Sequence, residues 1–236
     1  MEKLEKMTKD LEELQALMNK PKTLSTQAAG MFQEERRRIY EDPFLNTAGR
    51  AAKIEETQTL LARELMKEFS QVKADIKSKQ DKIVKEAESI VIGTIEKASE
   101  HDSLMFQHKF EQIKAEIGLS PNKDVALRNF KKFVQAIDHP SFAREIRNEF
   151  SSLANSLGGL GVDKTQLHLI LKEVTSKAMT EEQKKALEIK ESVESASNND
   201  LLIKGGVHQS TLSNIIGHHA ADFVNSPDEY LDKHAE

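Results

Sequence analysis

A polar stretch near the C-terminus, GGVHQSTLSNIIGHHA at 205–220, holds the residues whose types and spacing could do chemistry. Its histidines, His208, His218 and His219, raise the question of a metal site, because imidazole nitrogen is a common metal ligand. Adjacent side chains on a helix point about 100° apart, however, so His218 and His219 do not share a face. No HExxH motif and no pair of histidines four residues apart accompanies them. We therefore expect neither a metal ion nor another cofactor.

The remainder of the chain carries no catalytic signature. The glycine-rich segment GGLG at 158–161 follows no predicted strand and lacks the Lys-Ser/Thr pair of a phosphate-binding loop, so it indicates a break between helices. The sequence has no cysteine nucleophile and no GxSxG motif, and no pair of carboxylates stands out from its many glutamates. We therefore predict a protein that is not an enzyme.

The composition favours helices. Of the 236 residues, 31% are charged and only 5% are aromatic, which suits helices packed by Leu, Ile and Met better than a sandwich or a barrel. The absence of cysteine excludes a disulfide framework and a thiolate zinc site. No run of eighteen apolar residues occurs, and the first residues lack the apolar core of a signal peptide. We expect a cytoplasmic protein with no membrane partner.

The charge gives no general attraction to nucleic acid. The formal net charge is −5, so any binding of DNA would need a local basic face. The run EERRR at 34–38 is the densest basic cluster. Such a run is typical of a solvated helix face with neighbouring ion pairs rather than of a phosphate-binding patch.

Two stretches in the first hundred residues have the apolar spacing of a coiled coil. In the first, Leu, Met and neighbouring apolar residues recur at steps of three and four until Pro21, where we expect the helix to end. A separate helix, between the two stretches, then begins at a cap on Ser25 or Thr26 and ends before Asp42 and Pro43.

A very long helix is predicted from about residue 46 or 47 to about His101, because no proline interrupts that span. Its apolar residues recur every seven positions, but Lys79 and Glu86 replace apolar residues in the second half. Polar residues at such positions commonly set the register or the oligomeric state of paired helices.

Both stretches need a partner helix, since short amphipathic helices are unstable alone. Packing within the chain and pairing between chains satisfy this need equally, and we predict an obligate homo-oligomer with the long helices at its centre. The residues of the predicted oligomer seam are Leu4, Leu11, Leu14, Met18, Leu65, Phe69, Val72, Ile76, Ile83 and Ile90.

The second half carries most of the aromatic residues in several shorter amphipathic segments, which predict a compact helical bundle. Thr180 and Gln183 fit a capping box at the start of a later charged helix. No strand-like alternation is sustained, so the predicted fold class is all-α. We expect an oligomerisation domain of long helices at 1–101 and a helical bundle domain at 102–236.

The segment SNNDLLIKGGVHQSTLSNIIGHH resembles the helix-turn-helix of the lambda repressor and Cro class over about twenty residues, within 197–219. The resemblance implies that Leu201 starts a supporting helix, that Gly206 takes the turn, and that 200–217 forms the motif. It also implies DNA contacts in the major groove, where Gln and Asn pair with adenine and Thr touches a thymine methyl. The implied contact residues are Gln209, Ser210, Thr211 and Asn214.

Several features argue for an ordinary helical hairpin instead. Leu202 stands where the family prefers a small residue, and His208 replaces the usual Ser or Thr cap. From Asp200 to Glu236 the chain has four Asp and two Glu against two Lys, a net charge of −4, whereas phosphate neutralisation needs nearby Lys or Arg.

The stretch IYEDPFLNTAGRAAKIEETQTLLARE resembles a pattern in coiled-coil structural and minor virion proteins of tailed phages, within residues 1–101. That resemblance implies a multicopy component held by helix pairing, located in the virion if the protein comes from a phage. We therefore expect a non-enzymatic helical structural or assembly protein that binds itself and other structural proteins. The alternative is a dimeric DNA-binding protein that uses the C-terminal segment.

Overall fold

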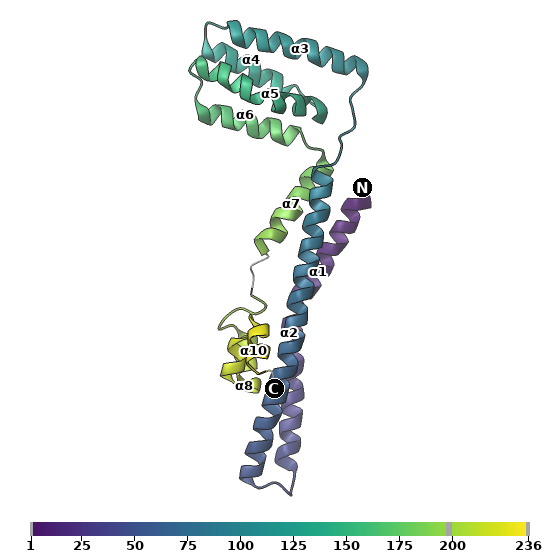
Figure 1. The fold of residues 1–236 in the computed structure, drawn as a ribbon, viewed down its shortest axis with the longest axis vertical. Helices are drawn as coiled ribbons and strands as arrows, with labels where there is room; N and C mark the ends of the chain where they lie inside the picture. Colours follow the sequence, from purple (N-terminus) through teal and green to yellow (C-terminus); the bar gives the residue numbers. More distant parts are fainter. Residues whose placement is uncertain (1, 197–199, 235–236) are drawn as a thin grey trace. The chain divides into compact units, whose positions relative to one another are not determined.

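The computed structural model describes residues 2–196 and 200–234, which fold into helices without strands (Figure 1), so the predicted all-α class is confirmed. The chain divides into two compact units. We call residues 87–189 the bundle unit, and residues 2–86 together with 190–236 the hairpin unit. We expected a single boundary near residue 101; instead the C-terminal segment joins the N-terminal helices. No helix in the described part of the chain is both long and apolar enough to span a membrane.

Two long antiparallel helices form the frame of the hairpin unit (Figure 1). Helix α1 runs over Glu2–Glu41 and helix α2 over Thr47–Val91. The predicted end of the first helix at Pro21 is wrong, because α1 continues through this residue. Pro21 is buried, and it continues the seven-residue spacing of the buried Met7 and Leu14. Its packing therefore outweighs the roughly 3 kcal/mol that a proline costs inside a helix.

The predicted caps at Ser25 and Thr26 are also wrong, since both residues lie inside α1. The Thr26 hydroxyl donates to the carbonyl of Lys22 at 3.1 Å. Ser25 is fully buried and donates to the carbonyl of His208 in the C-terminal segment at 3.2 Å.

Ion pairs between α1 and α2 occupy the polar positions of the predicted seam. Lys79 and Lys82 place their ammonium groups 2.9 and 2.7 Å from the two carboxylate oxygens of Asp10. Hydrogen bonds from these two lysines lower the pKa of the Asp10 carboxyl from 3.8 to about 2. Nearer the start of α1, the Lys6 ammonium lies 2.9 Å from a carboxylate oxygen of Glu86. A shift of either helix along the other would separate these charges, so the pairs fix the register of the hairpin.

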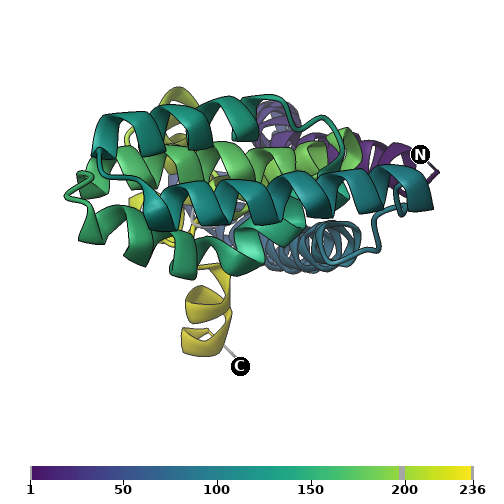
Figure 2. The ribbon, with the colours of Figure 1, turned by 90° about the horizontal axis from the view of Figure 1, so that it is seen from above.

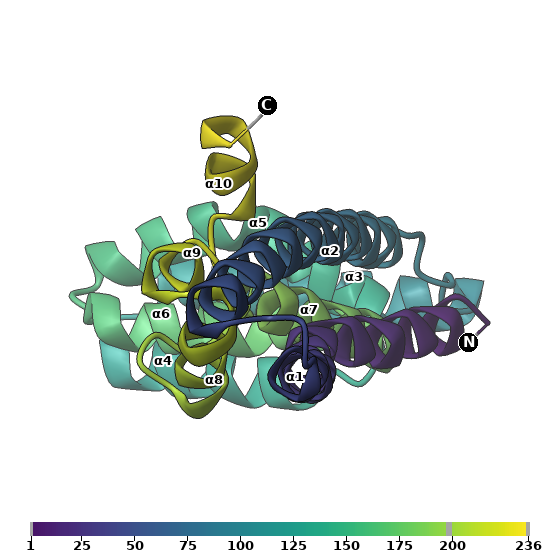
Figure 3. The same ribbon diagram turned by 90° about the horizontal axis from the view of Figure 1, so that it is seen from below.

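Three short C-terminal helices complete the core of the hairpin unit. They are α8 (Val207–Ile216), α9 (His218–Asp222) and α10 (Pro227–Lys233). Figure 3 shows α8 beside α1, and the two helices are in contact. The shared core consists of apolar side chains from α1, α2 and the C-terminal segment, among them Phe32, Met66, Phe69, Leu212, Ile215 and Val224.

Helix α2 ends at Val91, inside the bundle unit and about ten residues earlier than predicted. Gly93 closes the helix with a hydrogen bond from its N–H to the carbonyl of Ile90 at 3.0 Å. The Gln183 amide then donates to the carbonyls of Ile90, Val91 and Gly93 at 3.3, 3.1 and 3.1 Å. A helix that stops here provides no further turn of N–H groups for its last carbonyls, and Gln183 adds a side-chain donor to them.

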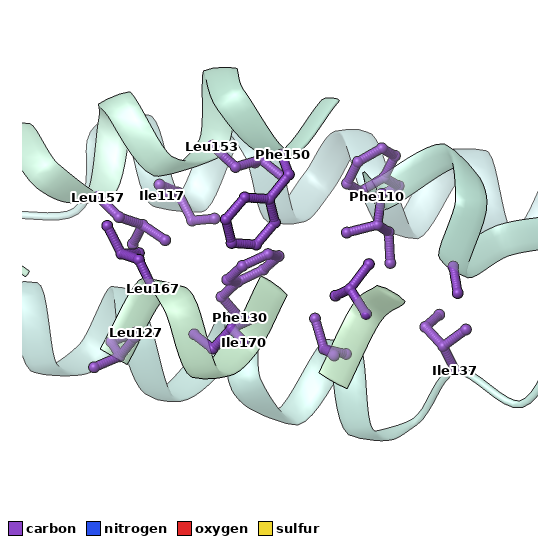
Figure 4. Packing of buried hydrophobic residues seen from close by; sticks show 14 of the residues in the cluster. Phe110, Ile117, Leu127, Phe130, Ile137, Phe150, Leu153, Leu157, Leu167 and Ile170 are labelled. Carbon is purple, nitrogen blue, oxygen red and sulfur yellow. The ribbon is translucent and has the colours of Figure 1, made fainter. Parts of the chain in front are cut away.

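Helices α3 to α6 run alongside one another in the bundle unit (Figures 1 and 2). They are α3 (Glu100–Leu119), α4 (Lys123–Gln135), α5 (Pro140–Gly159) and α6 (Lys164–Lys177). Their shared core contains the aromatic residues that the sequence placed there, and Figure 4 shows Phe130 facing Phe150 between the helices. The predicted helix break after α5 is confirmed.

Helix α7 (Glu181–Ala196) starts at the predicted capping box. The Gln183 N–H donates to the Thr180 hydroxyl at 3.2 Å, and the Thr180 N–H donates to the Gln183 side chain at 3.0 Å. Gln183 thus serves two helix ends at once, and it is almost completely buried.

Candidate functional site

The C-terminal segment does not form the predicted helix-turn-helix in its described part. None of residues 200–206 is helical, so Leu201 starts no supporting helix. The Asn225 side chain explains this local structure: it accepts from the Leu202 N–H at 3.0 Å and donates to the Leu202 carbonyl at 2.9 Å. Those backbone groups are then unavailable to a helix. The first residues of the resemblance, 197–199, lie outside the described residues.

The second helix of the predicted motif does form, as α8, and Gly206 takes the turn before it. The Gly206 N–H donates to the Ile203 carbonyl at 2.9 Å, and a Cβ on Gly206 would lie 2.9 Å from the same oxygen. Leu212 and Ile215 face the core, whereas Asn214 is exposed.

Gln209 already uses both ends of its amide inside the chain. Its oxygen accepts from the Gly205 N–H at 2.6 Å, and its nitrogen donates to the Ala221 carbonyl at 3.1 Å. The side chain therefore ties the turn before α8 to the end of α9. It is a structural link in this conformation, and the predicted pairing with adenine would have to break it.

Three of the four predicted contact residues share a polar hollow of about 540 Å³ on the hairpin unit. Gln209, Ser210 and Asn214 line it, but Thr211 does not, and the Thr211 hydroxyl donates to the Val207 carbonyl at 2.9 Å. The other lining residues are Lys204, Gly205, Ser213, His218 and Asp222.

A second hollow, of about 790 Å³, adjoins the first because Asn214 borders both. Helices α1 and α2 supply most of its walls. Two of its residues, Arg36 and Arg50, are cationic, and one, Glu55, is anionic. The remaining lining residues are Phe32, Tyr40, Thr47, Ala51, Ile54 and Gln58.

The sequence predicted ion pairs and no ligand binding for the EERRR run. In the structure, Arg36 and Arg38 of this run have different partners. Arg38 does pair with Glu34 at 2.7 Å and with Glu35 at 3.4 Å. Arg36 has no carboxylate partner among the described residues; its guanidinium lies 5.6 Å from the centre of the Tyr40 ring. The four-residue spacing of Arg36 and Tyr40 could have indicated from the sequence that the two side chains meet on one face of a helix. Nothing in the sequence pointed to Arg50, because only the folded hairpin brings it to the same hollow as Arg36.

The residues of the predicted oligomer seam are covered by their own chain. Within the hairpin unit, Leu14, Leu65, Phe69, Val72 and Ile83 are buried. Leu4, Leu11, Met18 and Ile76 are partly buried there, and Ile90 is buried in the bundle unit. The seam therefore has its partner helices without a second chain, and packing within the chain accounts for its apolar spacing.

Comparisons with protein-family models, with curated protein sequences and with solved structures found no match for this chain.

Proposed function

We propose that the protein is a non-catalytic helical assembly protein that associates with a second copy of itself through the tip of the α1–α2 hairpin. The observation that carries this proposal is Phe44, whose side chain is 93% exposed in the loop between the two helices. A structural role is also what the resemblance to coiled-coil proteins of tailed phages implies.

The loop that carries Phe44 is held by several hydrogen bonds. The Asp42 side chain accepts from the Phe44 N–H at 2.8 Å, and the Asp42 carbonyl accepts from Arg50 at 3.1 Å. On the other side, Asn46 accepts from the Gly49 N–H at 2.8 Å and caps α2. An ordered loop that keeps a large aromatic ring in water has little conformational entropy left to lose on docking.

A second copy is the partner to which we commit, because the exposed Phe44 ring fits a symmetric contact in which each copy contributes the same surface. Burying an exposed Phe side chain contributes about 2 to 3 kcal/mol, and a symmetric contact buries two of them. Association of this size is weak and depends on concentration.

The test is sedimentation velocity of the full chain over concentrations from about 1 to about 100 µM. We expect the wild-type protein to show a rising average mass, and Phe44→Ser to remain a monomer. Leu60→Ser is the matched control, because Leu60 is 59% exposed on α2 away from the loop. A wild-type chain that is monomeric throughout, or an equal loss in both variants, would contradict the proposal.

DNA binding is the second candidate, and one observation favours it: the fold brings Arg36 and Arg50 to a hollow that Asn214 also borders. The C-terminal segment alone lacks such cations. Fluorescence anisotropy with mixed-sequence duplex DNA at about 50 and about 200 mM salt tests the idea, since phosphate contacts weaken steeply with salt. The variant to compare is Ser210→Ala with Asn214→Ala, which leaves the structural link of Gln209 intact.

A further inference from the structure

We propose that the hollow lined by α1, α2 and Asn214 is a binding site for a phosphate group, held by the guanidinium groups of Arg36 and Arg50. This inference goes beyond self-association and does not depend on it. It names the ligand by its chemistry: a phosphate ester, which belongs either to a free nucleotide or to the backbone of a nucleic acid.

Arg50 has more donors than the chain satisfies. One terminal nitrogen donates to the Asp42 carbonyl at 3.1 Å. Its Nε is buried and has no acceptor within residues 2–196 and 200–234. A buried donor without an acceptor costs roughly 1 to 3 kcal/mol, so native proteins rarely keep one without a reason. A small adjustment of this side chain toward an oxyanion in the hollow would satisfy it.

Arg36 approaches the same hollow from α1. It forms no ion pair with any carboxylate of the described residues, although Glu55 lines the hollow too. Its guanidinium lies over the Tyr40 ring, 5.6 Å from the ring centre, and this contact restricts where the group can point. A guanidinium that is already positioned loses less entropy when it binds, and its planar set of donors matches phosphate oxygens.

The charges in the hollow favour a phosphate over a carboxylate ligand. Two cations face one carboxylate, Glu55, so the hollow has a formal charge of +1 before binding. A phosphate monoester carries a charge near −2 at neutral pH, and its three free oxygens can reach two separate guanidinium groups. Gln58 and Asn214 add neutral side-chain donors at the same walls.

The test uses isothermal titration calorimetry of the full chain with adenosine monophosphate, and adenosine as the ligand without phosphate. A parallel titration uses mixed-sequence duplex DNA. Arg36→Gln removes one guanidinium that has no hydrogen-bond partner in the described chain. Arg38→Gln is the matched control, because it removes the same charge from the same helix at a residue that is already paired. Far-UV circular dichroism establishes that both variants remain folded.

We expect Arg36→Gln to weaken binding about tenfold or more, as for the loss of a charged hydrogen bond, and Arg38→Gln to change it less than about twofold. Arg50→Lys, which keeps the charge but loses the planar donor set, should also weaken binding. Binding of the nucleotide but not of adenosine identifies a free nucleotide as the source; binding of the duplex alone identifies a nucleic acid. Binding of neither ligand, or equal losses in Arg36→Gln and Arg38→Gln, would overturn the proposal.

Discussion

Replacing Val72 with Asp is expected to unfold the hairpin unit rather than to separate two folded chains. Val72 is fully buried in α2, in the core shared by α1, α2 and the C-terminal helices. The substitution removes the two methyl groups on Cβ and places a carboxylate one carbon further from the backbone, so it both removes apolar contacts and brings a charge into the core. No Lys or Arg stands three or four positions away in the helix to pair with the new charge.

Two losses set the size of the destabilisation: the burial of the Val side chain and the cost of a carboxylate in the core. Losing the burial of a Val side chain costs about 1.5 to 2 kcal/mol, and an unpaired carboxylate in the core costs several kcal/mol more, whether it stays charged or takes up a proton. The sum is about 5 kcal/mol or greater. Because whole domains are stable by only about 5 to 15 kcal/mol, this loss is enough to populate the unfolded hairpin unit.

Hydrogen exchange measured by mass spectrometry separates the two units of the chain. Peptides of the hairpin unit should lose protection in Val72→Asp, while those of the bundle unit should keep theirs and serve as the internal reference. Leu60→Asp, at an exposed position of α2, should leave both units protected. The reasoning fails if Val72→Asp keeps full protection and wild-type helicity but sediments as a smaller particle, because the seam would then join two chains.

Two further predictions concern polar side chains. The pKa of Asp10 is lowered from 3.8 to about 2 in the folded chain, so its ion pairs stabilise the fold above pH 3.8 and are lost as the pH falls through about 2. Urea titrations over this pH range should show the free energy of unfolding fall by roughly 1 to 2 kcal/mol in the wild type and not in Asp10→Asn. Gln183→Ala removes a capping box and one donor to the carbonyls at the end of α2, so the bundle unit should melt earlier, by roughly 1 to 3 kcal/mol of stability. A melting curve for Gln183→Ala that matches the wild type would show that solvent satisfies those carbonyls equally well.

Local patterns in the sequence predicted the elements whose causes are local. The capping box at Thr180, the glycine break after α5 and the amphipathic faces of α3 to α6 all depend on residues within one or two turns of each other. The path of α1 through Pro21 depends instead on packing against distant residues, and for that reason the local rule for proline gave the wrong end.

The candidate site was predicted only in part, for a similar reason. The sequence pointed to the C-terminal polar residues and counted the charge of their own segment, which is negative. Arg36 and Arg50 come from helices more than a hundred and fifty residues earlier in the chain, and the pairing of α8 with α1 brings them near Asn214. The loss of the supporting helix depends on Asn225, whose bonds to Leu202 no spacing rule anticipates.

The division of the chain into two units also sets the order in which those units can fold during synthesis. The bundle unit is one continuous segment, and its contacts are complete once residue 189 has left the ribosome. The hairpin unit is formed from two separate segments of the chain. Phe69 shares its core with Leu212 and Ile215, which are synthesised some 140 residues later. Until then α1 and α2 expose the apolar surface that the C-terminal helices will cover. The nascent chain is therefore most prone to aggregation in its first third, and a chaperone that acts on it during translation would bind there.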